Sequence, residues 1–400
     1  MHWCAIMRTM ADIDAPGILF SPDGARLRPG AGSEKDLRII VRGGRMRIFR
    51  PDEGEAPSFE IKEYKGGYIA PPLLDSHVHL FLDGFFDRER RDRTAALDVE
   101  EALNRALVLL EKYRRLGIAA VRDGGDPKGL ALAAARLANA DPARYSAVLA
   151  SGEPIHRKGR YGGFLGAGVE NVREAVALLH RNKEAGASQA KILATGVNSL
   201  DKAGDYGGLQ FTIQELSQIF KAARTLKMSI MVHANGPCGR IAGLGPDSIE
   251  HGFWMEEGDL EALASENVVW TPTLTAWASL HHDPAMGPSK RAVIAETDSR
   301  QRMMVERAFR AGVRLAAGSD SGTPGVRHAE GLFDEISRLS SSGLGMECAL
   351  AAACARDDLD GGAEGGFVRY EEDPVLSPST MKRPLGVFLG GVYTDMEKDV

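Results

Sequence analysis

The pattern of apolar and polar positions changes near residue 72. Between residues 36 and 68, short apolar runs alternate with polar residues, and a Gly-Gly pair separates 39–41 from 46–49. Such alternation around a glycine turn is typical of a β-hairpin. After residue 72, short apolar runs alternate with longer stretches that have an apolar residue at every third or fourth position. This pattern predicts strands alternating with amphipathic helices.

Eight apolar runs are predicted to be strands, because each is short and most are apolar on both faces. The predicted strands span residues 73–80, 118–125, 145–152, 189–196, 228–234, 247–252, 268–274 and 313–322. The predicted helices span residues 98–117, 127–139, 169–185, 212–226, 256–265, 287–311 and 329–341. Eight such strands alternating with helices predict an α/β fold, a parallel (β/α)8 TIM barrel.

The two ends of the chain predict a second, smaller unit. Residues 365–394 return to short strands and turns, as in residues 36–72. We expect these β-rich flanks to pair into one composite β-sandwich domain, beside a catalytic barrel of residues 73–354. Residues 1–35 are rich in proline, glycine and charge and are not assigned to either unit.

Composition narrows the classes of function. The chain has 400 residues, 26% of them charged, and a formal net charge of −6, so we expect no basic surface for nucleic acid. No apolar run approaches the ~18 residues of a membrane span, and the first residues lack a signal-peptide pattern. The four cysteines form no CxxC pair, which fits a reducing compartment. We therefore expect a cytoplasmic protein with a small-molecule substrate; a homo-oligomer stays open.

Residues that bind metals stand at the ends of five predicted strands. The carboxyl ends of the strands of such a barrel form one rim, so these side chains are expected to meet. They are His77 and His79 on the first strand, Lys191 on the fourth, His233 on the fifth, His251 on the sixth and Asp320 on the eighth. Each histidine alone could be a packed core residue, and an aspartate alone could be a loop cap. Their coincidence at one rim favours a metal site.

The histidine pair and the lysine carry the most specific signal. His77 and His79 are two residues apart on a strand, so both point to the same side, and imidazole nitrogen is a common zinc ligand at about 2.0–2.1 Å. Lys191 interrupts an apolar strand, where burial lowers the pKa of a lysine. The neutral amine could add CO2 and form a carbamate, an anion that bridges two metals. The alternative for Lys191 is a structural ion pair.

The ordered motifs resemble the amidohydrolase superfamily from about residue 37 to residue 394. The barrel motifs that carry the resemblance are "GGYIAPPLLDSHVHL", "VRDGG", "AKILATG", "MVHANG", "SIEHG", "TPTL" and "GSDSG". The stretches "FVRYEEDP" and "RPLGVFLGGVYT" are similar to the closing sandwich strands of that superfamily. A strand-four lysine followed by "ATG" looks most like its prolidase-like and imidazolonepropionase-like branch.

The resemblance implies a role for each candidate ligand. His77 and His79 would bind a buried metal ion, and carboxylated Lys191 would bridge it to a second ion held by His233 and His251. The resemblance thus implies two divalent cations, with zinc favoured.

A metal-dependent amidohydrolase reaction follows from these roles. Asp320 would ligate the first metal and act as the catalytic acid and base. A metal-activated hydroxide would attack an amide or peptide-like C–N bond of a dipeptide or an N-acyl amino acid.

Contacts to the substrate are expected on loops that follow the third to fifth strands. The candidates are His156, Arg160, Tyr161, Tyr206 and Asn235. A guanidinium such as that of Arg160 can bind a carboxylate through two hydrogen bonds. For each of the five, an ordinary loop residue is the alternative. Tyr161 and Asn235 differ from the residues usual in the family, which leaves the substrate open.

Rival functions use the same rim. A cyclic amide or imide hydrolase, a deaminase, a lactonase or a phosphotriesterase could share it, and a barrel that lost catalysis could be a scaffold. Retention of all six metal-competent residues favours an enzyme. Glu250 and His328 are expected to support the ligands, and Cys238 is expected to be a packed residue.

Overall fold

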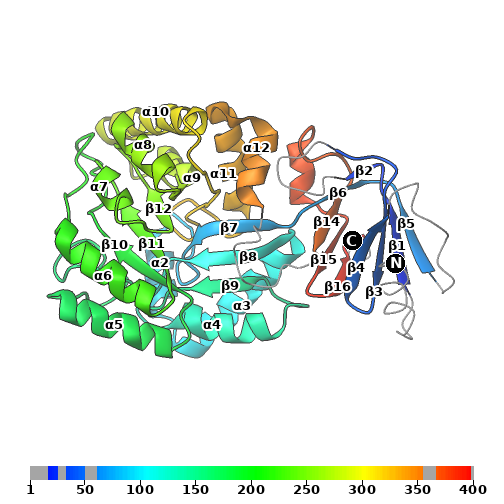
Figure 1. The fold of residues 1–400 in the computed structure, drawn as a ribbon, viewed down its shortest axis with the longest axis horizontal. Helices are drawn as coiled ribbons and strands as arrows, with labels where there is room; N and C mark the ends of the chain where they lie inside the picture. Colours follow the sequence, from blue (N-terminus) through cyan, green and yellow to red (C-terminus); the bar gives the residue numbers. More distant parts are fainter. Residues whose placement is uncertain (1–16, 26–32, 50–60, 355–365, 398–400) are drawn as a thin grey trace.

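The computed structural model describes residues 17–25, 33–49, 61–354 and 366–397. Figure 1 shows a barrel surrounded by helices on one side and a β-rich part on the other. Both ends of the described chain lie in the β-rich part (Figure 1).

The β-rich part consists of two sheets that pack face to face. The first has the strand order β4-β3-β1-β5 and the second β16-β15-β14-β6-β2. These strands span Gly17–Ser21 (β1), Gly24–Ala25 (β2), Arg38–Arg42 (β3), Arg45–Phe49 (β4), Ile61–Lys65 (β5), Tyr68–Ala70 (β6), Phe367–Tyr370 (β14), Gly386–Leu389 (β15) and Val392–Asp395 (β16). Apolar side chains from both sheets, including Phe20, Ile39 and Phe388, form its own small core.

Strands from both chain ends share the second sheet, because β14 pairs antiparallel with β6. The predicted hairpin is confirmed: β3 pairs antiparallel with β4 across Gly43 and Gly44, whose φ angles are 54° and 73°. Two successive positive φ angles are what a two-residue hairpin turn requires and what glycine tolerates. Strands β1 and β2 precede residue 36, so the β-rich part begins earlier than the sequence pattern predicts.

Seven regular strands line the barrel, all with parallel neighbours. They are Leu73–Val78 (β7), Ile118–Asp123 (β8), Ala147–Ala150 (β9), Gln189–Leu193 (β10), Ser229–Ala234 (β11), Ser248–His251 (β12) and Val269–Thr271 (β13). They form two sheets, β7-β8-β9 and β10-β11-β12-β13. Ile155 joins the two sheets, since its N–H donates to the Lys191 carbonyl and its carbonyl accepts from the Leu193 N–H, both at 2.8 Å.

The predicted eighth strand, 313–322, is not a regular strand, yet it closes the ring. The Trp270 N–H donates to the Arg314 carbonyl at 2.8 Å, and the His79 N–H donates to the Ser321 carbonyl at 2.8 Å. Asp320 has a positive φ of 57°, which breaks the extended conformation where the strand was predicted to continue. The segment therefore bridges β13 and β7 by isolated pairs only.

Helices cover the outside of the barrel (Figure 1). The α-helices span Arg88–Ala96 (α2), Val99–Arg115 (α3), Leu130–Ala140 (α4), Val172–Glu184 (α5), Ile213–Thr225 (α6), Gly239–Ala242 (α7), Glu257–Ser265 (α8), Leu274–Ser279 (α9), Pro288–Arg310 (α10), Glu330–Leu339 (α11) and Gly345–Ala353 (α12). The shorter helical turns span Leu280–His282 (η1), Ser340–Leu344 (η2) and Pro378–Lys382 (η3). The Thr212 side chain caps α6, and Glu215 completes the capping box.

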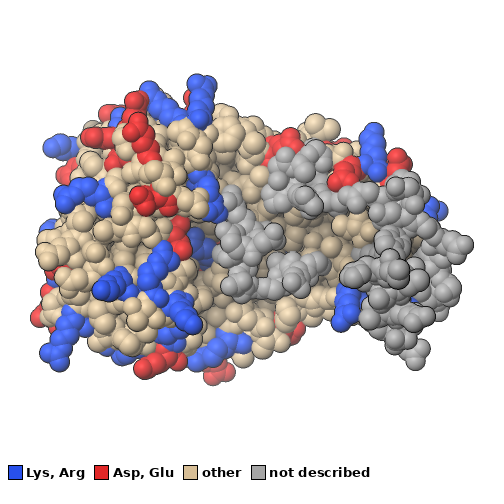
Figure 2. Space-filling view, in the orientation of Figure 1, with Lys and Arg blue, Asp and Glu red and all other residues tan. Residues whose placement is uncertain are grey.

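The surface carries charges of both signs. In the view of Figure 2, lysine and arginine side chains are interspersed with aspartate and glutamate over the barrel. Within the described part of the chain, no helix combines the length and the apolar character that crossing a bilayer requires.

Buried Glu335 of α11 ties that helix to the start of α9. Its carboxylate accepts hydrogen bonds from the Leu274 N–H at 3.0 Å, the Thr275 N–H at 2.8 Å and the Thr275 hydroxyl at 2.8 Å. These are N-terminal donors of α9, which otherwise lack partners within the helix.

We expect Glu335→Ala to lower the free energy of unfolding by about 3 kcal/mol, because buried donors would lose their acceptor. Urea unfolding followed by circular dichroism measures the change. Glu330→Ala is the control, since Glu330 makes a half-exposed pair with Lys112 and should change stability by less than ~1 kcal/mol. Equal losses in both variants would contradict this role of Glu335.

Candidate metal centre

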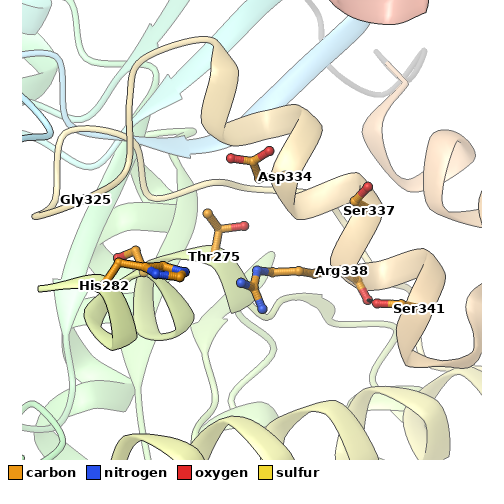
Figure 3. A pocket seen from close by; sticks show the side chains of 8 residues that line it. Thr275, His282, Gly325, Asp334, Ser337, Arg338 and Ser341 are labelled. Atoms are coloured by element: carbon orange, nitrogen blue, oxygen red, sulfur yellow. Dashed lines mark hydrogen bonds between the residues drawn. The ribbon is translucent and has the colours of Figure 1, made fainter. Parts of the chain in front are cut away.

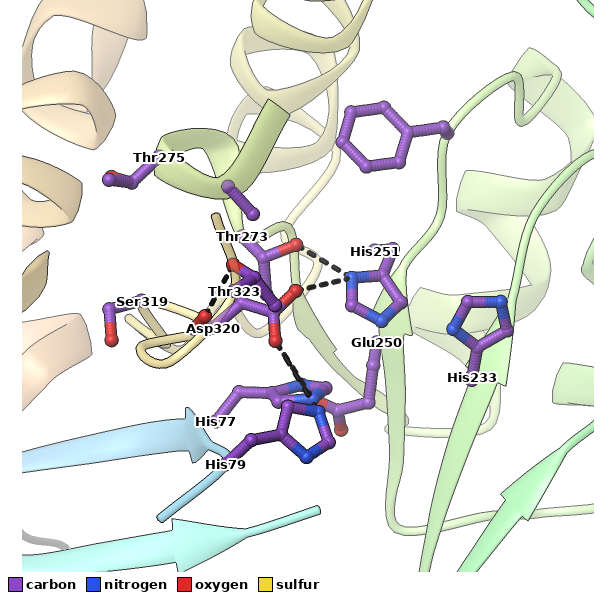
Figure 4. Close-up of polar contacts among 12 residues, drawn as sticks. His77, His79, His233, Glu250, His251, Thr273, Thr275, Ser319, Asp320 and Thr323 are labelled. Atoms are coloured by element: carbon purple, nitrogen blue, oxygen red, sulfur yellow. Dashed lines mark hydrogen bonds and ion pairs between the residues drawn. The ribbon is translucent and has the colours of Figure 1, made fainter. Parts of the chain in front are cut away.

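All six residues predicted to bind metal meet at the carboxyl ends of the barrel strands. His77 lies within β7 and His79 just after it, Lys191 lies in β10, and His233 and His251 lie at the ends of β11 and β12. Figure 4 shows the histidine rings and the Asp320 carboxylate turned toward one another. The ring centroids of His77 and His251 are 4.9 Å apart, and those of His233 and His251 are 4.6 Å apart.

The spacing of the ligand atoms fits a cation. Asp320 Oδ1 is 3.5 Å from His79 Nε2 and 3.7 Å from His77 Nε2. It is buried and has no hydrogen-bond partner among the described residues. Two ligands held at about 2.0–2.1 Å around a tetrahedral ion lie about 3.4 Å apart. The ligand atoms of His77, His79 and Asp320 all lie within 4.8 Å of one another, so these three residues can hold one ion.

Hydrogen bonds to the rear of three imidazoles leave the other ring nitrogen facing the cluster. His77 Nδ1 is 2.8 Å from Glu250 Oε2. His251 Nδ1 is 2.8 Å from the Thr273 hydroxyl. His233 Nε2 is 3.0 Å from the Gly196 carbonyl oxygen, so that nitrogen carries the proton and Nδ1 keeps a free lone pair. Partners of this kind fix the ring orientation of metal-binding histidines.

Lys191 lies beside the histidines. Its amine is 3.2 Å from His77 Nε2, and its side chain is buried. Burial lowers the pKa of Lys191 to about 8, although the nearby carboxylates of Glu250 and Asp320 act in the opposite direction. Burial also raises the pKa of Asp320, against the effect of the Lys191 charge.

The histidines of the cluster are held neutral. Burial, and next the positive charge of Lys191, lowers the pKa of His79 to about 3 and that of His233 to about 4. Burial lowers the pKa of His77 and His251 well below the ordinary value too. Neutral imidazole is the form that coordinates a metal.

The backbone at this rim is strained. His251, Thr273 and Asp320 have φ angles of 68°, 48° and 57°. Positive φ is costly for residues other than glycine, and such strain clusters at functional sites because the surrounding structure must hold it. His251 ends β12 and Thr273 follows β13, and Asp320 lies in the segment that closes the ring, so the strain lies where the chain turns at the mouth of the barrel.

Comparison with known proteins identifies the family. Residues 68–359 match the profile of the Amidohydrolase family. The chain belongs to the amidohydrolase family. It is therefore a metal-dependent hydrolase that acts on carbon–nitrogen bonds, and its His77–His79–Asp320 group could hold a metal ion.

Three similar proteins place this amidohydrolase among known sequences and structures. An uncharacterized protein of Mycobacterium tuberculosis is 24% identical over 379 residues, which cover 90% of this chain and 93% of that protein. Imidazolonepropionase of Methylobacterium nodulans is 28% identical over 279 residues, or 61% of this chain and 66% of the enzyme. The crystal structure of a Xaa-Pro dipeptidase with bound methionine aligns with a TM-score of 0.82 and 20% identity, covering 95% of this chain and 100% of that one.

A cavity of about 460 Å³ opens onto the cluster. Five of the six candidate ligands line it, together with two of the five predicted substrate contacts, Tyr161 and Asn235. The Tyr161 ring packs 5.3 Å from the His233 ring, and burial raises the pKa of its hydroxyl. Asn235 Nδ2 is 3.3 Å from the Gly196 carbonyl oxygen.

The other three predicted substrate contacts do not line this cavity. His156 is buried with its ring nitrogens 3.3 Å and 3.2 Å from the carbonyl oxygens of Arg157 and Gly166, so it supports its own loop. Arg160 is exposed. The Tyr206 ring lies against Gly236. The sequence placed these residues on the correct loops, but loop conformation turns their side chains elsewhere.

The expected supporting residues take two forms. Glu250 contacts the candidate ligand His77 through Oε2. Arg122, which the sequence analysis did not predict, has its NH1 nitrogen 3.7 Å from Glu250 Oε1. His328 Nε2 is 3.0 Å from the Leu82 carbonyl oxygen, so it holds the loop after β7. Cys238 is buried, and its thiol donates to the Gly236 carbonyl, as expected for a packed residue.

Several other residues that line this cavity were not predicted from the sequence. They include Arg91, Phe164, Leu200, Phe253, Trp277 and Leu280. They come from loops and short helices after the strands, where no motif marks them. On the other side of α9, Thr275 and Ser279 line a second cavity of about 480 Å³ that also holds Asp334 and Arg338 (Figure 3).

We expect Glu250→Gln to weaken metal binding about 10- to 100-fold, the usual effect of removing a partner behind a ligating histidine. Competition with a chelator on the purified protein measures the affinity. Glu335→Gln is the matched control, because it alters another buried carboxylate, whose hydrogen bonds go to Leu274 and Thr275 and not to the cluster. Unchanged affinity in the Glu250 variant would contradict the role of Glu250 in orienting His77.

Proposed function

We propose that this amidohydrolase cleaves the amide bond of a dipeptide or an N-acyl amino acid with two divalent metal ions, zinc in the first instance. The observation that carries the proposal is the position of Lys191. A buried lysine amine 3.2 Å from His77 Nε2, with its pKa lowered to about 8, is suited to become neutral and add CO2. The resulting carbamate would offer one oxygen to each metal.

The donor set supports two positions on either side of Lys191. His77, His79 and Asp320 would hold the first ion. His233 and His251 would hold the second, since each has a ring nitrogen without a competing hydrogen bond on the side of the cluster. A carbamate on Lys191 would complete both positions with an oxygen ligand, which an ammonium group cannot do.

Bound divalent metals acidify water and polarise a carbonyl group. The chain supplies the proton transfer: Asp320 Oδ2, 4.0 Å from His251 Nδ1, lies at the rim, and a carboxylate there would accept a proton and pass it to the leaving amine. Tyr161 and Asn235 line the same cavity and are proposed to contact the substrate near the scissile bond. The walls of the cavity would exclude bulk water from the reacting groups.

Two kinds of relative bear on the substrate. The Xaa-Pro dipeptidase structure spans the whole of this fold and supports an open-chain peptide-like amide. The imidazolonepropionase match covers a smaller share of the chain and favours a cyclic amide as the second candidate. A purified enzyme tested on dipeptides, N-acyl amino acids, cyclic amides and lactones separates the two. Turnover of the open-chain amides is expected, and turnover of lactones or cyclic amides alone would contradict the proposal.

Metal loading tests the role of Lys191. We expect the wild-type protein to bind two zinc ions and Lys191→Ala to bind at most one, with activity lost in parallel. Elemental analysis after gel filtration measures both. Two ions per chain in the variant would overturn the bridging role.

Carbamate formation should also depend on pH. Only the neutral amine reacts with CO2, and its fraction rises as the pH is raised from 6 through the lowered pKa of about 8. Reconstitution of metal-free protein with zinc, at one fixed concentration of dissolved CO2 for which bicarbonate is raised at the higher pH, should therefore load the second ion faster at pH 8 than at pH 6. Bicarbonate should not affect the loading of Lys191→Ala. Loading that is independent of bicarbonate and of pH in the wild-type protein would contradict a carbamate.

A further inference from the structure

Most of the wall of the active-site cavity is apolar. Phe164, Leu200, Phe253, Trp277 and Leu280 line it, together with the polar side chains of Asn198 and Thr323 and the cation Arg91. The cavity volume of about 460 Å³ lies in the range of sites that enclose a small-molecule ligand. Such walls favour a bulky apolar group, since burying each square ångström of apolar surface contributes about 25 cal/mol.

Arg91 of α2 is the only arginine among the described residues that line this cavity. One guanidinium nitrogen, NH1, donates to the Phe85 carbonyl at 3.1 Å and to the Phe86 carbonyl. The side chain is half-buried. Within the described ranges, no carboxylate lies within ion-pair distance of Arg91, and its other two guanidinium nitrogens have no hydrogen-bond partner.

The neighbouring arginine shows what a paired side chain looks like here. Arg90 Nε is 3.4 Å from Asp83 Oδ2, and its guanidinium lies over the Phe85 ring. Arg90 does not line the cavity. Adjacent arginines of one helix thus differ: one is neutralised within the protein, and the other faces the substrate cavity without a counter-charge.

The charge balance of the cavity favours an anion at Arg91. The only carboxylate among the described lining residues is Asp320, which faces the histidines and Lys191. A guanidinium held by two backbone carbonyls at one end is already oriented, and its other edge matches the two oxygens of a carboxylate. A half-buried cation without a counter-charge carries a desolvation penalty that a bound anion offsets.

We propose that Arg91 binds the carboxylate of the substrate while the apolar wall holds a bulky side chain, so that the preferred substrate is the free acid of an N-acyl or dipeptidyl derivative of an apolar amino acid. This inference rests on the proposed function, because it names the substrate class of the same site. It predicts discrimination against neutral amides of equal shape.

Binding of inert ligands tests the inference without turnover. Isothermal titration calorimetry of the zinc-loaded protein compares 3-phenylpropionate with 3-phenylpropanamide, which differ in the charge and not in the apolar group. We expect the carboxylate to bind roughly 10- to 100-fold more tightly, as charge-assisted hydrogen bonds do. Arg91→Met should remove this preference, and the matched control Arg90→Met should retain it. Arg91→Gln replaces Arg91→Met if the latter fails to fold.

The possible results distinguish an error in the role of Arg91 from an error in the proposed function. A preference that persists unchanged in Arg91→Met would mean that the metal centre binds the carboxylate, and would overturn the inference. An equal affinity of the two ligands for the wild-type protein would overturn it too. Acetate should bind at least about tenfold more weakly than 3-phenylpropionate; equal binding would refute the apolar part. Failure of all amides in the hydrolysis panel would instead overturn the proposed function, while the ligand preference could still be measured.

Discussion

The burial of Lys191 among four imidazoles is the constraint on which the rest of the site depends. An isolated ammonium group in such a place is unfavourable, because burial removes its hydration and the neighbouring rings offer no negative charge. The nearest carboxylates, Glu250 and Asp320, oppose the lowering of its pKa but do not prevent it. Loss of a proton removes this unfavourable buried charge. The neutral amine is the form that would add CO2 to give the proposed carbamate, which two cations would neutralise. Burial is also the main reason that the pKa values of the four histidines are lowered and that their rings stay neutral.

The barrel provides the geometry that brings these residues together. Parallel strands deliver each side chain at the same rim, and backbone turns with positive φ at His251, Thr273 and Asp320 aim the ends of the last strands inward. Behind the first row of side chains, Glu250, Thr273 and the Gly196 carbonyl fix the imidazole rings. Outside the rim, the hydrogen bonds of Glu335 hold the start of α9.

Much of this architecture could be predicted from the sequence, because apolar runs and capping residues are local signals. The hairpin at Gly43 and Gly44 and the barrel follow from such patterns, and the amidohydrolase family follows from the resemblance of the ordered motifs. The short strands β1 and β2 could not be assigned, because their pairing with distant strands leaves no periodic signal. The eighth strand was overestimated, since its apolar run continues where the backbone turns at Asp320.

The candidate site divides in the same way. The six candidate ligands predicted at strand ends lie together at one rim, because the direction of a parallel strand fixes where its end lies. The predicted loop residues divide: Tyr161 and Asn235 line the cavity, whereas His156, Arg160 and Tyr206 do not. Arg91 and Trp277, which lie on short helices and were not predicted, line it too. Loop conformation depends on non-local packing, and no motif of the sequence marks a lone arginine as unpaired.

The most direct test of the central claim is anomalous diffraction at the zinc edge from crystals of the metal-loaded protein. The account predicts two peaks about 3.5–4 Å apart, one beside His77, His79 and Asp320 and one beside His233 and His251, with the density of a carboxylated Lys191 between them. A single peak, or an unmodified Lys191 side chain that contacts no metal, would contradict it.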